Sequence, residues 1–198
     1  MNRFRLFSII CIECLLFTIP SNSQIQSGEY SGLNLAFNPN TKKITGYFEM
    51  YSGIDQMFSC IFYMEGNYTD SVSKIRTYYP ENKDEDLING NIHLIDSTTI
   101  SISLPEEHGG CWNVYHFADT TTDWNFKIAK KTNWIEISYI TADKAFFYRE
   151  KSENTKRKAC LLKNDIIYID KIEDNWIHCI YSGKSITEGW IKLNDIYQ

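Results

Sequence analysis

The sequence of 198 residues has little proline and glycine, with 4 and 10 residues respectively, which excludes a collagen-like or low-complexity chain. It also lacks a surplus of positive charge, because 20 Lys and Arg stand against 25 Asp and Glu. Nucleic-acid binding requires a concentrated basic surface, so the net charge of −5 argues against nucleic acid as a partner. With 43% hydrophobic and 15% aromatic residues, the chain can bury a substantial core.

Residues 1–23 have the pattern of a secretory signal peptide. A basic start and an apolar stretch over residues 6–19 precede Pro20, and small residues then occupy the positions before a cleavage point at Gln24: Arg3, Arg5, Ser21 and Ser23. Cleavage removes two arginines and one glutamate and so changes the formal net charge from −5 to −6. We therefore expect a periplasmic or secreted protein.

Two other interpretations of the N-terminus are less favoured. A transmembrane anchor needs about 20 consecutive apolar residues, whereas this stretch is shorter and contains Glu13. Lipid attachment normally requires a small residue before the cysteine, but Cys11 follows an isoleucine and Cys14 follows a glutamate. The mature chain is therefore expected to carry no transmembrane anchor.

The rest of the chain shows the alternation of apolar and polar residues that is typical of β-strands. It recurs in segments spread over the whole length, which include 33–37, 58–64, 100–104 and 124–128. No window of eleven or more residues has apolar positions at helical spacing together with helix caps. The sequence predicts an all-β fold, with an acidic loop at 81–86 and a polar loop at 149–158.

Near the C-terminus the order of residue types is distinctive. A short aromatic segment ends at Tyr148, residues 159–165 lead into the apolar run 166–169, and an aromatic segment follows at 176–181. The sequence Gly189-Trp190-Ile191 then precedes a closing segment that contains Asp195. Over roughly the last 60 residues, this order resembles that of bacterial SH3-like (SH3b) domains. Asn164 stands where the family usually has glycine, and asparagine tolerates the left-handed conformation of such a turn.

The resemblance implies a binding or spacing module rather than a catalytic one. We expect an antiparallel N-terminal β domain over 24–132, followed by a small SH3-like barrel over 133–198. Gly189 allows a sharp bend in its strand, and the neighbouring indole is expected to be buried over it. The candidate ligand site is an aromatic groove that contains four side chains: Tyr148, Trp176, Tyr181 and Trp190.

Four cysteines remain after cleavage, and this even number in an exported protein indicates disulfide bonds with three possible connectivities: Cys60, Cys111, Cys160 and Cys179. A bond within each predicted domain is the simplest arrangement, joining Cys60 to Cys111 and Cys160 to Cys179. The second bond has an alternative, since both of its cysteines occupy apolar positions of the SH3-like pattern and two buried thiols would fit as well. No CxxC pair is present in the mature chain, from Gln24 onward, which argues against a zinc ribbon or a thioredoxin-like site.

The sequence contains no convincing catalytic site. Cys111 follows two glycines, and His93, His108 and His116 are available as bases, but a nucleophilic cysteine usually begins a helix. Here a strand-like run over 113–117 follows, so a structural disulfide is the preferred role. Gly-x-Ser-x-Gly and Asp-Cys-Ser motifs are absent, and the histidines lack partners at metal-ligand spacing. We predict no catalytic residue, no metal and no cofactor.

These observations favour an exported, non-enzymatic binding protein with an SH3-like module that recognises a protein or a cell-wall peptide. A first alternative is a periplasmic inhibitor or immunity protein that covers an exported toxin or hydrolase, because an acidic surface steers toward basic partners. A second alternative is a cell-envelope hydrolase whose catalytic groups come from distant strands.

Overall fold

The computed structural model describes residues 24–119, 121 and 124–198. The predicted signal peptide lies outside these residues. The all-β prediction is confirmed, because strands and short 3-10 turns make up the regular structure of the described residues. Within this part of the chain, no helix has the length and apolar character needed to cross a bilayer.

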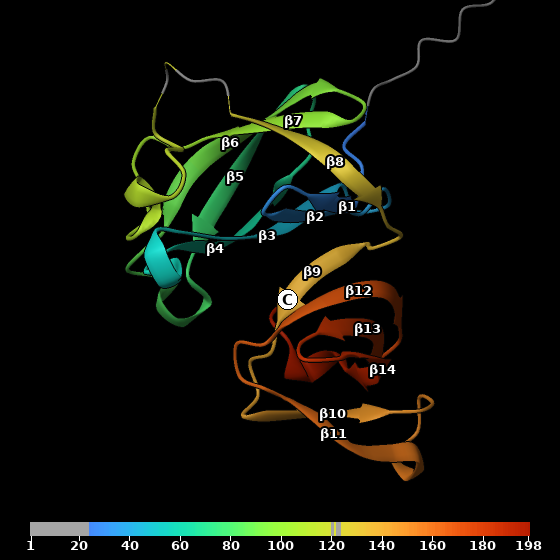
Figure 1. Cartoon of the computed structure of the whole chain (residues 1–198). Helices are drawn as coiled ribbons and strands as arrows, with labels where there is room; N and C mark the ends of the chain where they lie inside the picture. The colour runs from blue at the N-terminus through green and yellow to red at the C-terminus, as the bar shows by residue number, and fades with distance from the viewer. Residues whose placement is uncertain (1–23, 120, 122–123) are drawn as a thin grey trace, which may run out of the picture.

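The first eight strands form a closed antiparallel barrel in which sequence neighbours pair and β1 closes the sheet against β8 (Figure 1). Their bounds are β1 Gly28–Tyr30, β2 Leu33–Phe37, β3 Lys43–Ser52, β4 Phe58–Asn67, β5 Val72–Tyr78, β6 Ile88–Asp96, β7 Thr99–Ser103 and β8 Asn125–Lys131. Every second side chain points inward, as the alternation predicts. The interior is therefore filled with apolar groups such as Leu35, Phe48, Phe62, Ile92 and Phe126.

The remaining strands form a six-stranded antiparallel sheet in the order β11-β10-β14-β13-β12-β9, below the barrel in Figure 1. Their bounds are β9 Glu136–Tyr139, β10 Lys144–Tyr148, β11 Lys156–Leu162, β12 Ile166–Glu173, β13 Trp176–Ser182 and β14 Ile186–Lys192. A separate core packs on one face of this sheet and includes Phe147, Leu161, Ile177 and Ile191. Asn164 has a φ of 70°, which confirms the expected left-handed turn between β11 and β12.

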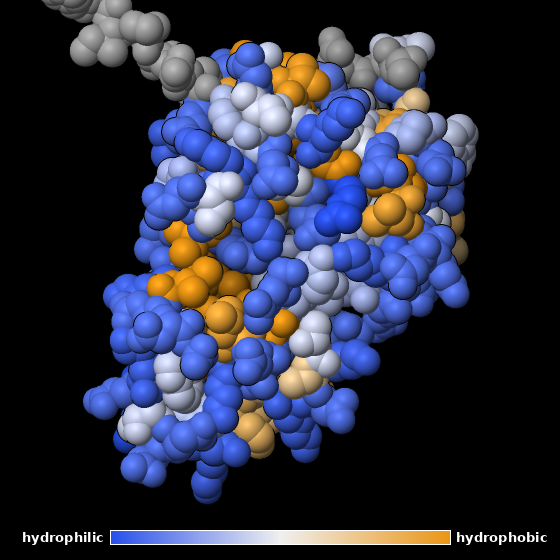
Figure 2. All heavy atoms as spheres, turned by 180° about the vertical axis from the view of Figure 1, so that it is seen from behind, coloured by the Kyte–Doolittle hydropathy of each residue, from blue (hydrophilic) through white to orange (hydrophobic). Residues whose placement is uncertain are grey.

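A layer of aromatic side chains joins the barrel to the second sheet. Tyr63 and Tyr78 from the barrel pack in one buried cluster with Trp134, Ile137 and Tyr139. The Tyr63 hydroxyl donates a hydrogen bond to the carbonyl of Ile137 over 2.9 Å, and both groups are buried. The last residues of the chain return to this layer, as the C-terminal label in Figure 1 shows. Seen from behind, the mostly hydrophilic surface has an apolar patch at about mid-height (Figure 2).

Of the five 3-10 turns in the described residues, four lie in connections between strands and the last follows β14: η1 Ile54–Gln56, η2 Pro80–Asn82, η3 Cys111–Asn113, η4 Glu153–Thr155 and η5 Leu193–Asp195. The prediction of a strand-like run over 113–117 is wrong. Cys111–Asn113 forms a turn, and the following residues fold over one end of the barrel with Phe117 buried in its core. Apolar content in this run therefore reflects burial of a loop rather than a pleated strand.

Candidate functional site

Three of the four predicted groove residues lie on one face of the second sheet. Trp190 of β14 stands opposite both Tyr148 of β10 and His178 of β13. The rings of Tyr148 and Trp176 meet edge to face, with 4.9 Å between their centroids. Directly opposed residues of an antiparallel pair point to the same side of a sheet. We call this surface, formed by Tyr148, Trp176, His178 and Trp190, the aromatic face.

The fourth predicted residue, Tyr181, lies on the other side of the sheet. It packs against the core of the second sheet, and its hydroxyl donates a hydrogen bond to Asp165 over 3.3 Å. The reason is the alternation of strand side chains, since Trp176 and Tyr181 are an odd number of residues apart in the same strand β13. Tyr181 therefore does not contribute to the aromatic face.

The members of the aromatic face differ in their access to solvent. Trp176, His178 and Trp190 are half-buried, whereas Tyr148 is buried and forms the floor of the surface. The Tyr148 hydroxyl donates a hydrogen bond to Glu153 over 3.2 Å. Burial, followed by this hydrogen bond and the negative charge of Glu153, raises the pKa of Tyr148 above its ordinary value. The hydroxyl proton is engaged in the bond to Glu153.

Charged side chains surround the indole of Trp190. The ammonium groups of Lys151 and Lys171 lie 5.5 and 6.0 Å from the centroid of its ring, within range of a cation–π interaction. Both lysines are paired with Glu173. The aromatic face thus offers ring surfaces bordered by charges of both signs, which suits a peptide that has both apolar and charged groups.

His178, a member of the aromatic face, makes a contact that sequence reasoning missed. Its Nδ1 atom lies 2.8 Å from a carboxylate oxygen of Asp170, and its ring lies 5.3 Å from that of Trp190. Asp170 occupies an irregularity in the pairing of β12 with β13. A local change of register of this kind leaves no clear pattern in the sequence, so the pairing of Asp170 with His178 could not be predicted.

A second polar cluster is buried at one end of the barrel. The His108 ring is 2.8 Å from Asp86 at Nδ1 and 2.8 Å from the Thr77 hydroxyl at Nε2. This order of carboxylate, imidazole and hydroxyl is that of a hydrolytic triad. However, Thr77 and the His108 side chain are fully buried, and the Phe62 ring stacks on the imidazole. Because a substrate cannot reach the hydroxyl, the cluster serves to fix the acidic loop and the segment around His108 to the barrel.

The disulfide between Cys60 and Cys111 is confirmed, with an S–S distance of 1.97 Å. It joins β4 to the turn η3 and lies in the barrel core, where both residues have no exposed surface. Gly110 precedes it with a φ of 84°, and a Cβ atom there would lie 2.3 Å from the Ser59 carbonyl. This close approach requires glycine. While the bond stands, Cys111 has no thiolate to act as a nucleophile.

The structure does not contain the second predicted disulfide. Cys160 is an exposed free thiol on β11 and Cys179 is a buried free thiol on β13. Strands β10 and β14 lie between β11 and β13, so the two cysteines are too far apart to bond. Burial raises the pKa of the Cys179 thiol, which makes it unreactive. Only this residue fits the alternative of a buried thiol.

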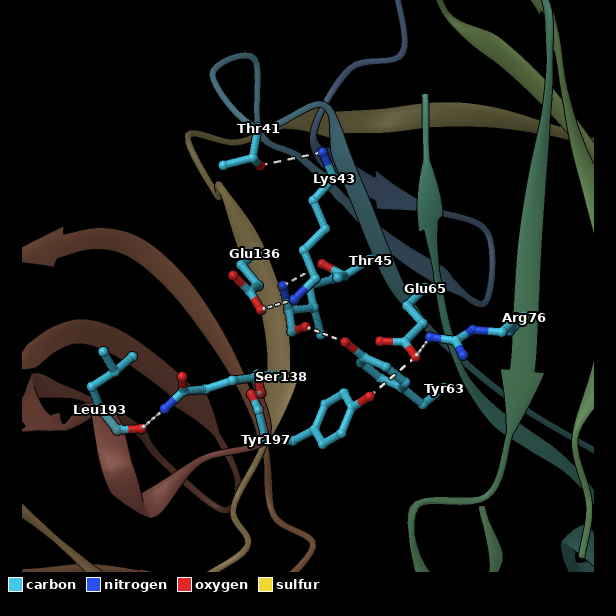
Figure 3. Close-up of polar contacts among 12 residues, drawn as sticks. Thr41, Lys43, Thr45, Tyr63, Glu65, Arg76, Glu136, Ser138, Leu193 and Tyr197 are labelled. Atoms are coloured by element: carbon cyan, nitrogen blue, oxygen red, sulfur yellow. Dashed lines mark hydrogen bonds and ion pairs between the residues drawn. The ribbon is translucent and has the colours of Figure 1, made fainter. Parts of the chain in front are cut away.

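Figure 3 shows a third group of polar side chains, contributed by the barrel and by the adjoining second sheet. Glu65 is buried and accepts hydrogen bonds from Arg76 over 2.6 Å and from the Tyr197 hydroxyl over 3.2 Å. Lys43 donates to Glu136 over 2.7 Å. Sequence reasoning missed these residues because their pairing depends on strand register and on contacts between distant segments.

Comparisons with family models, with curated proteins and with solved structures find no match to this chain. Within residues 24–119, 121 and 124–198, no group of three or more His, Cys, Asp or Glu side chains is arranged to hold a metal ion.

Proposed function

We propose that this chain is an exported, non-enzymatic binding protein that recognises a protein or a cell-wall peptide through an SH3-like module over residues 133–198. The observation that carries the proposal is the aromatic face. Its Trp176 ring packs against the buried Tyr148, its Trp190 ring packs against His178, and two lysines border the Trp190 ring. Half-buried tryptophan and tyrosine side chains dominate the binding energy of many protein interfaces.

The order of elements supports the SH3-like assignment. The hairpin β10–β11 is followed by three sequential antiparallel strands, β12, β13 and β14, and then by the short turn η5. Ile196 next pairs with Ile140, directly after β9, so that the end of the segment returns to its beginning. Short strands that return to their own first strand are a feature of small barrels.

The disulfide supports export, because such bonds persist in oxidising compartments and are rare in the cytosol. Mass spectrometry of the protein recovered from an envelope or culture-supernatant fraction should give a mature chain that begins at Gln24. Full-length protein recovered from the cytosol would contradict export.

The binding proposal is tested with purified peptidoglycan and its soluble stem peptides as probes. We expect Trp176→Ala to weaken binding of the full mature chain by about tenfold, the loss expected for one interface tryptophan. Trp112→Ala is the matched control, because Trp112 is an exposed indole on the barrel, 65% exposed. Equal loss in both variants, or no binding of either probe, would contradict a cell-wall peptide as the ligand.

A specific surface favours the alternative of an inhibitor of an exported toxin or hydrolase. Exposed apolar side chains gather on the β3–β4 hairpin and the adjacent turn η3: Tyr51, Ile54, Met57, Phe58 and Trp112. The disulfide and a hydrogen bond from Ser52 to the Asn113 carbonyl, over 2.7 Å, hold the two segments together. A braced apolar tip suits insertion into the cleft of a partner. Under this alternative, Ile54→Asp abolishes inhibition of the purified partner, while Trp176→Ala leaves it unchanged.

A further inference from the structure

A groove of about 970 Å³ lies on the outer surface of the barrel, over strands β3 to β6. Its polar lining includes Lys43, Glu65, Lys74, Arg76 and three asparagines, at positions 67, 89 and 91. It is separate from the aromatic face, which is formed by β10, β13 and β14. The proposed function assigns no role to this groove.

Two glycines, Gly66 and Gly90, lie in the floor of the groove. Ile75 stands between Gly66 of β4 and Gly90 of β6, and this row faces the barrel interior. A Cβ atom on Gly66 would lie 2.3 Å from the Lys74 carbonyl, and one on Gly90 would lie 2.6 Å from the Ser103 carbonyl. The backbone beside each of these glycines thus lies too close to admit a side chain, which requires glycine at both positions.

Strand register arranges the polar side chains of the groove in two rows. In the first row, Glu65 lies opposite Arg76, and Arg76 lies opposite Asn89. In the second row, Lys74 lies opposite Asn91, and Lys43 lies opposite Asn67. A ligand that lies along the two rows would therefore contact cationic side chains and primary amides next to one another.

Some charged side chains of the groove form ion pairs with neighbouring residues, whereas others do not. Glu65 is held by Arg76 and by Lys83, whose ammonium group lies 3.4 Å away (Figure 3 shows the first pair). Lys43 is bound to Glu136. Within the described residues, the exposed Lys74 and the side chains of Asn89 and Asn91 make no hydrogen bond or ion pair. The lining carries three cations and one carboxylate, which makes it locally positive on a chain of net charge −5.

We propose that this groove binds an acidic peptide segment of a partner protein in an extended conformation. Lysine and arginine pair with carboxylates through charge-assisted hydrogen bonds. A primary amide offers both a donor and an acceptor, which matches the N–H and C=O groups of a peptide backbone. The described lining contains no aromatic ring on which a sugar could stack. An acidic peptide therefore fits the lining better than an acidic glycan.

Isothermal titration of the full mature chain with a blocked hexaglutamate peptide tests the proposal. We expect binding that weakens with added salt, and binding of the matched hexaglutamine peptide at least about tenfold weaker. Lys74→Gln should reduce the affinity for hexaglutamate by about tenfold, because one charge-assisted contact is lost. Asn91→Ala gives a second, uncharged test of the same row. Lys127→Gln on β8 is the matched control, since Lys127 is also an exposed strand lysine and does not line the groove.

Three results would overturn the proposal. The first is the absence of hexaglutamate binding at millimolar concentration. The second is equal affinity in the Lys74→Gln variant and the parent chain. The third is tighter binding of oligogalacturonate than of hexaglutamate, which would identify a glycan site. Because Trp176 does not line the groove, Trp176→Ala should leave hexaglutamate binding unchanged, so failure here is distinguishable from failure of the proposed function.

Discussion

At the scale of single residues, the Cys60–Cys111 bond is the strongest covalent constraint on the barrel. It closes a loop across a sequence separation of 51 residues. Chain-entropy models assign roughly 4 kcal/mol to a loop of this length. We expect the double variant Cys60→Ala/Cys111→Ala to lose about this amount of unfolding free energy in urea titration. Cys160→Ser is the control, because Cys160 is an exposed free thiol. If reduction of the parent chain leaves its urea midpoint unchanged, the bond does not stabilise the fold.

His108 should make the stability of the barrel depend on pH. Burial lowers its pKa below the ordinary value and outweighs the opposing effect of Asp86. The unfolded chain therefore binds a proton more readily than the folded one, so unfolding free energy is full above about pH 6.5 and falls as the pH drops below it. Urea titrations over this range should show the slope, and His108→Gln should remove it. An unchanged slope in the variant would assign the effect to other groups.

At the scale of elements, the alternation of side chains along β14 places a core residue and a residue of the aromatic face on opposite sides of the sheet. Ile191 is fully buried in the core of the second sheet, whereas Trp190 is half-buried on the opposite side. The expectation that Trp190 is buried is therefore wrong. We expect Ile191→Ala to cost about 2–5 kcal/mol and Trp190→Ala to cost less, as measured by urea unfolding of the full chain. A larger loss for Trp190→Ala would place the tryptophan in the core after all.

Alternation predicted the fold class and several strands because it is a local signal. It also indicated which face Tyr181 occupies, since Tyr181 is five positions after Trp176 in the same strand and an odd offset reverses the face. The pairing of Glu65 with Arg76 and of Glu136 with Lys43 could not be predicted. These contacts depend on register and on barrel closure, which join segments far apart in the chain. The groove on the barrel was missed for the same reason, although Gly66 and Gly90 mark its floor.

At the scale of the whole molecule, the aromatic layer couples the barrel to the second sheet. Beyond the Tyr63–Ile137 bond, the Thr45 hydroxyl accepts a hydrogen bond from the Ile137 amide over 2.7 Å. Tyr139 and Tyr197 stack with 4.9 Å between their rings, and Tyr63 meets Tyr139 edge to face at 5.3 Å. Separating the two parts would expose these rings and leave buried polar groups without partners. We therefore expect the barrel and the second sheet to unfold together.

Tyr63→Phe tests this coupling with a minimal change. It leaves the buried Ile137 carbonyl without the Tyr63 hydroxyl, which costs about 1–3 kcal/mol. In native-state hydrogen exchange, the slowest amides of β4 and of β13 should then lose protection by the same free energy, because global unfolding limits both. Tyr181→Phe is the control, since its hydroxyl bonds Asp165 and its ring packs against the core of the second sheet. If Tyr63→Phe lowers protection only in the barrel strands, the two parts unfold independently, and the boundary predicted near residue 132 separates two autonomous domains.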